Sequence, residues 1–171
     1  MSTDSDDVAR VRSATAADLP AVAAIYDYEV EHGISTFDLE PPPLAYWERR
    51  LASTEPGDHL LVVEYDGRVS GYGYSSAYRP RPAYSRTRET SVYLASDARG
   101  RGLGRLLYDR LLALMTADGV HVAVALIALP NPTSVTLHER CGFVHLGTMH
   151  EVGFKFGRWI DTAWFERRLA P

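Results

Sequence analysis

Three arginines alternate with glycines in one short segment of the chain. Residues 99–105 read Arg-Gly-Arg-Gly-Leu-Gly-Arg. Glycine lets the backbone approach an anion closely, because no Cβ stands in the way. The free N–H groups at the start of a following helix would point at that anion, with the helix dipole behind them. Arg99, Arg101 and Arg105 add positive charge, so the segment predicts a cradle for phosphate groups.

The spacing of Gly100, Gly102 and Gly104 separates this cradle from two common phosphate-binding motifs. A dinucleotide-binding fold needs Gly-x-Gly-x-x-Gly, and a P-loop needs Gly-Lys-Ser/Thr. Neither pattern is present. Taken alone, the segment leaves one alternative open, a glycine-rich turn whose arginines are solvated.

Two titratable residues lie where they could move protons. Glu89 stands at the start of the strand expected before the cradle, and burial in a cleft would raise its pKa and suit it to act as a base. The alternative for Glu89 is an ion pair with Arg86 or Arg88. His138 could serve as an acid or a second base, or it could be a histidine that is hydrogen-bonded at a helix–strand junction.

The other histidines and the single cysteine indicate no further reactive centre. Cys141 precedes Gly142 at an expected helix end, without triad-like neighbours, so we expect a buried structural thiol rather than a nucleophile. One cysteine also fits a reducing compartment. The remaining histidines do not show metal-ligand spacing, and we expect no metal: they are His32, His59, His121, His145 and His150.

The elements around the cradle follow from hydrophobic periodicity and turn residues. Residues 15–18 resemble a capping box with Asp in place of Glu, and Gly33 suits the end of the helix behind it. Asp66-Gly67 is a two-residue hairpin turn. Helices are expected from about 19 to 32, near 44–51, at 103–117 and at 132–141. Strands are expected at 8–13, 59–65, 68–76, 89–94, 121–129, 143–151 and 159–169.

Length and composition limit the class of protein. The chain has 171 residues with 46% hydrophobic content, which fits one domain over residues 8–171 behind a flexible arm at 1–7. No apolar run is long enough to cross a membrane, and the acidic start does not resemble a signal peptide. The net charge of −4 argues against nucleic acid as a partner.

The phosphate cradle resembles a known family motif. Arg99-x-x-Gly102-x-Gly104 is similar to the Gln/Arg-x-x-Gly-x-Gly/Ala motif of the GNAT superfamily of N-acetyltransferases. The resemblance implies an α/β (α+β) fold, with a central mixed, mostly antiparallel twisted sheet of about seven strands, about four helices and splayed fourth and fifth strands. It also implies acetyl-CoA as cosubstrate, held by Val92, Tyr93, Leu94, Arg99, Gly100, Arg101, Gly102, Leu103, Gly104, Arg105, Asn131 and Ser134.

Four further segments resemble the phosphinothricin N-acetyltransferase branch of that family. They are Glu89-Thr90-Ser91-Val92-Tyr93, residues 128–135, Leu137-His138-Glu139, and residues 153–161. The branch acetylates the α-amine of phosphinothricin, methionine sulfoximine or methionine sulfone, which are small glutamate-like compounds. The resemblance therefore implies a small-molecule amine as substrate and a homodimer, while the single cysteine and the start of the sequence favour a cytoplasmic enzyme.

The same resemblance assigns roles within the active site. Glu89 and His138 become the catalytic residues, and His138 stands where many family members have a tyrosine that protonates the leaving thiolate. The loop 78–84 should cover the acceptor site. The implied acceptor-binding residues are Phe37, Arg81, Tyr84 and Thr90.

Two other functions stay open at this point. One is a family member that acetylates a different small amine or a protein N-terminus. A polyamine would favour an acidic pocket, which the Arg-rich loop at 78–84 argues against. The other is a non-catalytic acyl-CoA-binding module, against which the presence of Glu89 and His138 weighs.

Overall fold

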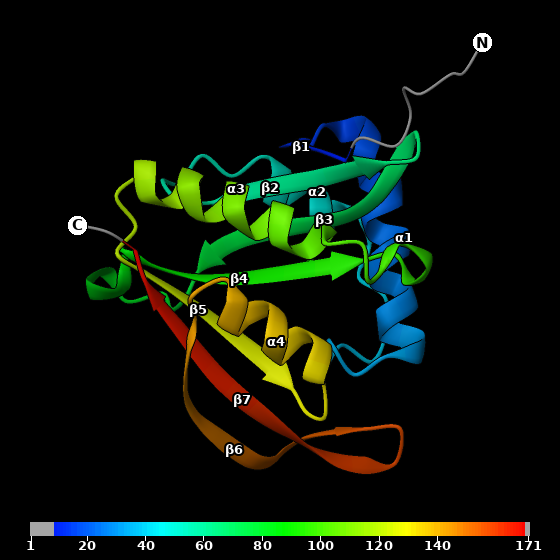
Figure 1. The fold of residues 1–171 in the computed structure, drawn as a ribbon, viewed down its shortest axis with the longest axis vertical. Helices are drawn as coiled ribbons and strands as arrows, with labels where there is room; N and C mark the ends of the chain where they lie inside the picture. The colour runs from blue at the N-terminus through cyan, green and yellow to red at the C-terminus, as the bar shows by residue number, and fades with distance from the viewer. Residues whose placement is uncertain (1–8, 170–171) are drawn as a thin grey trace.

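The computed structural model describes residues 9–169, and its centre is one seven-stranded sheet (Figure 1). The strands lie in the order β1-β2-β3-β4-β5-β7-β6, and only the β4–β5 pair is parallel. Sheet and helices together confirm the predicted fold class. The strands are β1 (Arg10–Ser13), β2 (His59–Tyr65), β3 (Arg68–Ala77), β4 (Thr87–Leu94), β5 (Val122–Ala128), β6 (Val144–Lys155) and β7 (Arg158–Arg168).

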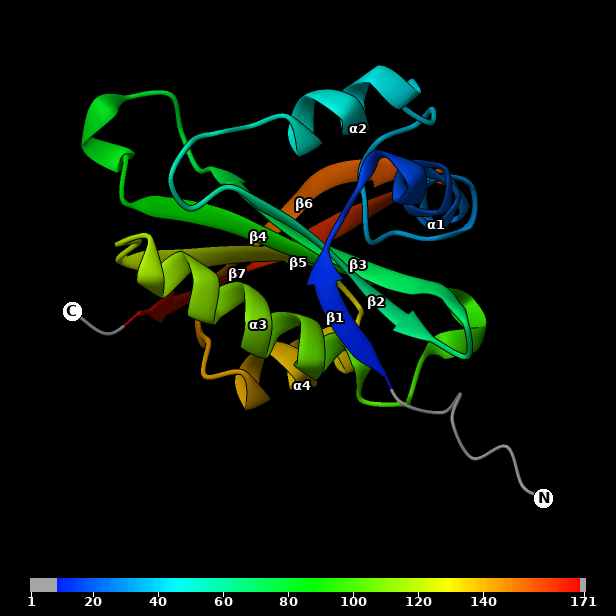
Figure 2. The same cartoon turned by 90° about the horizontal axis from the view of Figure 1, so that it is seen from above.

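Helices cover both faces of the sheet, as the view from above shows (Figure 2). On one face lie α1 (Leu19–His32) and α2 (Leu44–Leu51), and on the other lie α3 (Leu103–Ala117) and α4 (Pro132–Arg140). Each face has its own core. Trp47 and Tyr72 are fully buried in the first, and Leu107 and Tyr108 in the second. Short 3₁₀ turns lie at Ala16–Asp18, Pro82–Tyr84 and Ser96–Ala98.

The ends of α1 follow the sequence signals. The Asp18 carboxylate accepts a hydrogen bond from the Thr15 backbone N–H at 2.7 Å, as in a capping box. The helix ends at His32, before Gly33. Gly33 does not have a left-handed φ. A glycine is needed there for lack of room, because a Cβ would lie 2.1 Å from Oε2 of Glu29. The glycine therefore makes room for a buried carboxylate.

The sheet opens in its middle. β4 pairs with β5 only through Thr87–Glu89 and Val122–Val124, whereas its later residues stay paired with β3 up to Leu94. Beyond Glu89 the two parallel strands diverge, which leaves the β5-facing edge of β4 without a protein partner. Backbone groups on such an edge can pair with an extended ligand.

The last hairpin is longer than the hydrophobic pattern indicated. β6 continues past residue 151 to Lys155, with an irregular register between Met149 and Gly153. Asp161 stabilises this bulge by accepting from the Glu151 N–H at 2.8 Å and pairing with His150 at 2.8 Å. The bulge interrupts the alternation on which the expected boundary rested.

The first strand begins at Arg10 rather than at residue 8, which lies outside the described residues together with the arm predicted at 1–7. In the part of the chain that the structure describes, no helix combines the length and apolar character needed to cross a bilayer.

Candidate active site

A cavity of about 530 Å³ occupies the gap between the diverging strands. β4 supplies one wall, β5 and the start of α4 supply the other, and Arg99 and Gly100 lie at the cradle end. This cavity, which we call the cofactor cavity, brings together many of the predicted cofactor-binding residues. Its lining includes Val92, Tyr93, Leu94, Arg99, Gly100, Asn131, Ser134 and His138.

A second cavity of about 450 Å³ lies beside the first. The loop after α1, strand β3, Glu89 and the β6–β7 hairpin line it. Five residues line both cavities, so a group in one can reach a group in the other at their junction. They are Ser35, Ser91, Tyr93, Leu126 and Ala128.

Glu89 lies in the second cavity, which we call the acceptor cavity. Burial raises the pKa of its carboxyl above the ordinary value, while the positive charges of Arg50 and Arg79 lower it in part. A carboxylate with a raised pKa is a better base at neutral pH. Its neighbour Arg88 does not neutralise it, because successive strand residues point to opposite faces.

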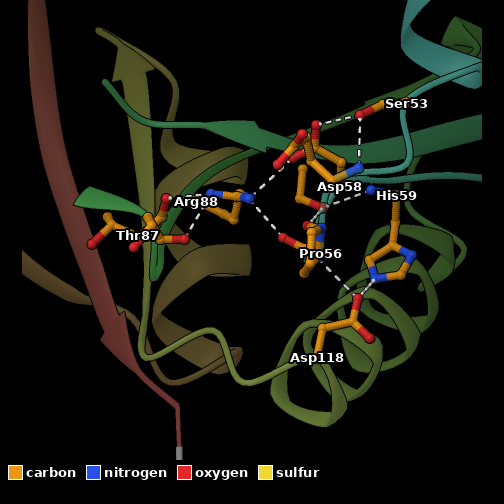
Figure 3. A network of polar contacts seen from close by, with 11 residues as sticks. Ser53, Pro56, Asp58, His59, Thr87, Arg88 and Asp118 are labelled. Atoms are coloured by element: carbon orange, nitrogen blue, oxygen red, sulfur yellow. Dashed lines mark hydrogen bonds and ion pairs between the residues drawn. The ribbon is translucent and has the colours of Figure 1, made fainter. Parts of the chain in front are cut away.

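Arg88 instead holds the backbone around the site together (Figure 3). Its Nε lies 2.9 Å from Oδ1 of Asp58, and its guanidinium donates to the Pro56 carbonyl at 2.6 Å. Asp118, at the end of α3, accepts from the Gly57 N–H at 2.9 Å and lies 2.9 Å from the His59 ring. The network fastens the loop before β2 to β4 and α3, next to Glu89.

His138 lies in the first cavity, on the other side of the junction from Glu89. Its Nδ1 lies 2.7 Å from the Ser134 carbonyl, which can only accept, so Nδ1 carries the proton. Nε2 then accepts from the Tyr108 hydroxyl at 2.7 Å, and Tyr108 is 3.3 Å from Oγ1 of Thr90. Burial lowers the pKa of His138, which keeps the ring neutral at pH 7.

The cradle has the backbone that a phosphate site requires. Gly100 and Gly102 have φ of 77° and 78°, with open space where a Cβ would stand. Gly104 allows close packing of α3 on α4, since a Cβ there would be 2.9 Å from Leu137 Cδ2. The first turn of α3 presents N–H groups that lack helical partners.

The cradle arginines each contact a protein group in this structure. Arg99 pairs with the buried Glu29, and Arg101 donates to the Tyr65 hydroxyl at 3.2 Å. Arg105 pairs with Asp109 at 2.8 Å. Residues 101–105 lie at the helix start and outside the cavity lining. The glycine backbone, the open edge of β4 and Asn131, which caps α4 by accepting from Ser134 N–H at 3.1 Å, together fit acetyl-CoA.

The predicted acceptor residues fall in three places. Phe37 lines the acceptor cavity, whereas Thr90 is buried and lines the cofactor cavity beside Tyr108. Arg81 and Tyr84 lie on the exposed loop between β3 and β4. The Tyr84 ring packs edge-on against Tyr78 at 5.3 Å, and Tyr78 lies 6.3 Å from Trp164 in the acceptor cavity.

Sequence reasoning missed several lining residues of both cavities. Tyr108 fell within the helix expected at 103–117 and was given no role, although its hydroxyl holds His138. Tyr74 pairs with Ser91 across β3 and β4, so strand alternation could have placed both in the acceptor cavity with Glu89. No local signal marked others of them, among which are Ser35, Met149, Val152 and Trp164.

The single cysteine is buried and free, and burial raises the pKa of its thiol. Within residues 9–169, no group of three or more His, Cys, Asp or Glu side chains is arranged to hold a metal ion.

Comparison with known proteins shows the family to which this chain belongs. Residues 11–164 match the model of the acetyltransferase (GNAT) domain, and the chain belongs to this family of acetyltransferases. A phosphinothricin N-acetyltransferase of Streptomyces coelicolor is 44% identical over 166 residues, which cover 94% of this chain and 96% of the relative. An L-methionine sulfoximine/L-methionine sulfone acetyltransferase of Pseudomonas aeruginosa is 37% identical over 165 residues, covering 95% and 96%.

Solved structures agree with this assignment. A GNAT phosphinothricin acetyltransferase of Sinorhizobium meliloti, in complex with acetyl-CoA, has a TM-score of 0.90 at 40% identity, over 95% of this chain and 89% of that one. A putative acetyltransferase of Salmonella typhimurium with acetyl-CoA has a TM-score of 0.88 at 34% identity, over 95% and 94%.

Proposed function

We propose that this chain is an acetyl-CoA-dependent N-acetyltransferase that acts on the α-amino group of a small, glutamate-like amino acid such as phosphinothricin, methionine sulfoximine or methionine sulfone. The observation that carries the proposal is the pair of adjoining cavities. One reaches Arg99 and Gly100 at the start of the phosphate cradle, the other has Glu89, and Ser91 and Tyr93 line both. The named relatives supply the acceptor class.

Glu89 is the proposed base. When bound, acetyl-CoA supplies a thioester whose carbonyl carbon is attacked by a neutral amine. An α-amine is largely protonated at neutral pH, and each unit by which its pKa exceeds the pH costs about 1.4 kcal/mol. Glu89 removes that proton directly or through one water. Its place in the acceptor cavity and its raised pKa support this role.

His138 is the proposed acid on the leaving-group side. The ring lines the cofactor cavity, so it would lie on the side of a bound coenzyme rather than on that of the amine. It must first take a proton from water at Nε2, where it now accepts from Tyr108, and that proton then passes to the leaving thiolate. Because burial lowers its pKa, the protonated ring then donates readily. This division of labour favours Glu89 over His138 as the base.

The loop between β3 and β4 is the proposed cover of the acceptor. An arginine fork binds two oxygens of a carboxylate or phosphinate at once, which suits Arg81. The edge-on packing of Tyr84 on Tyr78, beside Trp164, links this loop to the cavity wall. Phe37 supplies an apolar surface for the methylene part of the amino acid.

A homodimer is part of the proposal. The β6–β7 hairpin exposes a row of large apolar side chains, which is unusual for a monomer. They are Val144, Leu146, Met149, Val152, Phe154, Phe156 and Trp159. Equilibrium sedimentation should give twice the chain mass, and Phe154→Glu should lower it; a monomeric wild type would refute this part.

The cytoplasm is the proposed compartment. Cys141 is a free, buried thiol, and unpaired cysteines are typical of reducing compartments. Cell fractionation checks this assignment, and recovery of the protein in an extracytoplasmic fraction would contradict it.

A panel of amines tests the acceptor class. Phosphinothricin, methionine sulfoximine, methionine sulfone, spermidine and an aminoglycoside are compared by kcat/KM, with release of free thiol as the signal. The three amino acids should be preferred by at least about tenfold, which corresponds to about 1.4 kcal/mol. Preference for spermidine or the aminoglycoside would overturn the acceptor class, and no thiol release with any amine would overturn the enzymatic function.

A further inference from the structure

Lys155 occupies an unusual position for a charged residue. It is the only lysine in the sequence, and it is buried at the end of β6. Its ammonium group donates to the backbone carbonyl of Thr36 at 3.0 Å and to that of Glu29 at 3.3 Å. Burial of an ammonium without hydrogen-bond acceptors is costly. The two carbonyls therefore form a built site for this charge.

These carbonyls stand at the two ends of one segment. Glu29 lies in the last turn of α1, where its carbonyl also accepts from the Gly33 N–H at 2.9 Å and the helix dipole favours a cation. Thr36 lies beyond the turn that follows the helix. One wall of the acceptor cavity follows α1 and is formed by Ile34, Ser35, Thr36 and Phe37. Lys155 bonds this wall at Thr36 and the helix end before it at Glu29, and we call residues 34–37 the acceptor wall.

Close packing joins the acceptor wall to β6 at a second point. A Cβ at Gly153 would lie 2.5 Å from Cε2 and 2.5 Å from Cζ of Phe37, so the ring rests directly on the strand backbone. Met149 and Val152 of the same strand also line the cavity. One strand therefore supplies part of the pocket and anchors the part that faces it.

The other anchors of the acceptor wall come from different elements. The Tyr26 hydroxyl is 2.7 Å from Oγ1 of Thr36, and the Tyr93 hydroxyl donates to the Ser35 carbonyl at 3.1 Å. These bonds keep the segment on α1 and β4 when Lys155 is removed. The lysine is what ties it to β6 by hydrogen bonds, so its loss should alter the shape of the pocket more than the fold.

We propose that Lys155 is a positioning residue for the acceptor, because it holds residues 33–37 against β6 and so sets the shape of the pocket that receives the amine. The inference rests on the proposed function, which identifies that pocket as the amine site. Lys155 acts through the acceptor wall and contacts no reacting atom.

Lys155→Met tests the proposal, because it removes the donors at similar side-chain length. With the preferred amine, KM should rise about tenfold, the effect of losing hydrogen bonds from a charged group, while kcat stays within about threefold. Coenzyme A affinity, measured by calorimetry, should not change. Arg110→Met, which removes an exposed cation on α3 that lines neither cavity, is the control and should leave KM unaltered. An unchanged KM, or a loss confined to kcat, would overturn the proposal.

Hydrogen exchange gives a second readout that needs no turnover. Amides of residues 33–37 should exchange faster in Lys155→Met than in wild type, while residues 99–105 keep their rates. If the wild type acetylates no amine, the proposed function fails, yet the exchange result still decides whether Lys155 holds the wall. If Lys155→Met does not fold, Lys155→Gln, which keeps two N–H donors, should give a smaller change in the same direction; no change in exchange would refute the inference.

Discussion

The guanidinium carbon of Arg50 lies 3.9 Å from the centre of the Tyr74 ring, and Tyr74 lines the acceptor cavity together with Glu89. Arg50 also donates to the Tyr46 hydroxyl at 2.7 Å. Its charge lowers the pKa of Glu89, against the rise that burial causes. A cation on α2, which sequence reasoning did not single out, thus tunes the candidate base.

Arg50→Met should move the acid limb of the pH profile to higher pH. Removal of the nearby charge raises the pKa of Glu89 further, and the base works only when it is deprotonated. The profile of kcat/KM against pH measures this shift. Arg49→Met, its exposed neighbour on the same helix, should leave the limb in place. A limb that stays put or moves to lower pH in Arg50→Met would contradict the electrostatic coupling.

Glu89→Gln should lower kcat by about 10²–10⁴-fold, the usual contribution of a positioned base. Coenzyme A should still bind with wild-type affinity, since Glu89 lies in the acceptor cavity and outside the cofactor cavity. Steady-state kinetics and calorimetry separate the two effects. Full activity of this variant at neutral pH would remove Glu89 from the mechanism.

His138 should make the stability of the protein depend on pH. Its folded-state pKa is lowered by burial, so the unfolded chain binds more protons just below the ordinary value of about 6.5. The free energy of unfolding should therefore rise as the pH increases toward about 6.5 and fall as the pH drops below it, because the unfolded chain then takes up a proton that the buried ring does not. Urea denaturation at pH 5.5 and pH 7 measures the difference. In His138→Gln the free energy of unfolding should change less with pH. If it changes equally in the variant and the wild type, other groups cause the dependence.

Gly102→Ala should weaken coenzyme A binding. Gly102 has φ of 78° and open space around its Cα, so alanine adds strain of about 1–2 kcal/mol without a clash. The cradle backbone should relax away from the geometry that presents its N–H groups. Gly119→Ala is the control, because Gly119 has φ of 80°, equally open space and a place beyond the far end of α3. Both should lose similar thermal stability, and only Gly102→Ala should lose affinity. Equal coenzyme A affinities in the two variants would show that the cradle backbone does not contribute to cofactor binding.

Periodicity predicted every helix and strand in its correct order, with boundaries off by a few residues. Its largest error concerned β6, where alternation ends at the bulge between Met149 and Gly153. The bulge depends on Asp161 of the partner strand, which accepts from the Glu151 N–H across the hairpin. A pattern read along one segment does not contain that contact. The divergence of β4 and β5 came from family resemblance alone, because pairing length is decided between strands.

The site was predictable where local chemistry defines it. The cradle glycines were found from the backbone conformation that a phosphate site needs, whereas Asn131 and Thr90 were assigned only by the family resemblance. Thr90 is placed by alternation: Glu89 and Ser91 face the acceptor cavity, so the residue between them points toward α3 and Tyr108. Tyr108 itself follows helical spacing typical of core residues, and only the folded structure brings its hydroxyl to His138.

The short ladder between Thr87–Glu89 and Val122–Val124 divides the sheet into two halves joined by few backbone bonds. A pantetheine arm laid along β4 would act as a surrogate strand that bridges them. Ligand that binds only the native state stabilises it by mass action. The free energy of unfolding of this protein is therefore expected to increase with the concentration of acyl-coenzyme A around it.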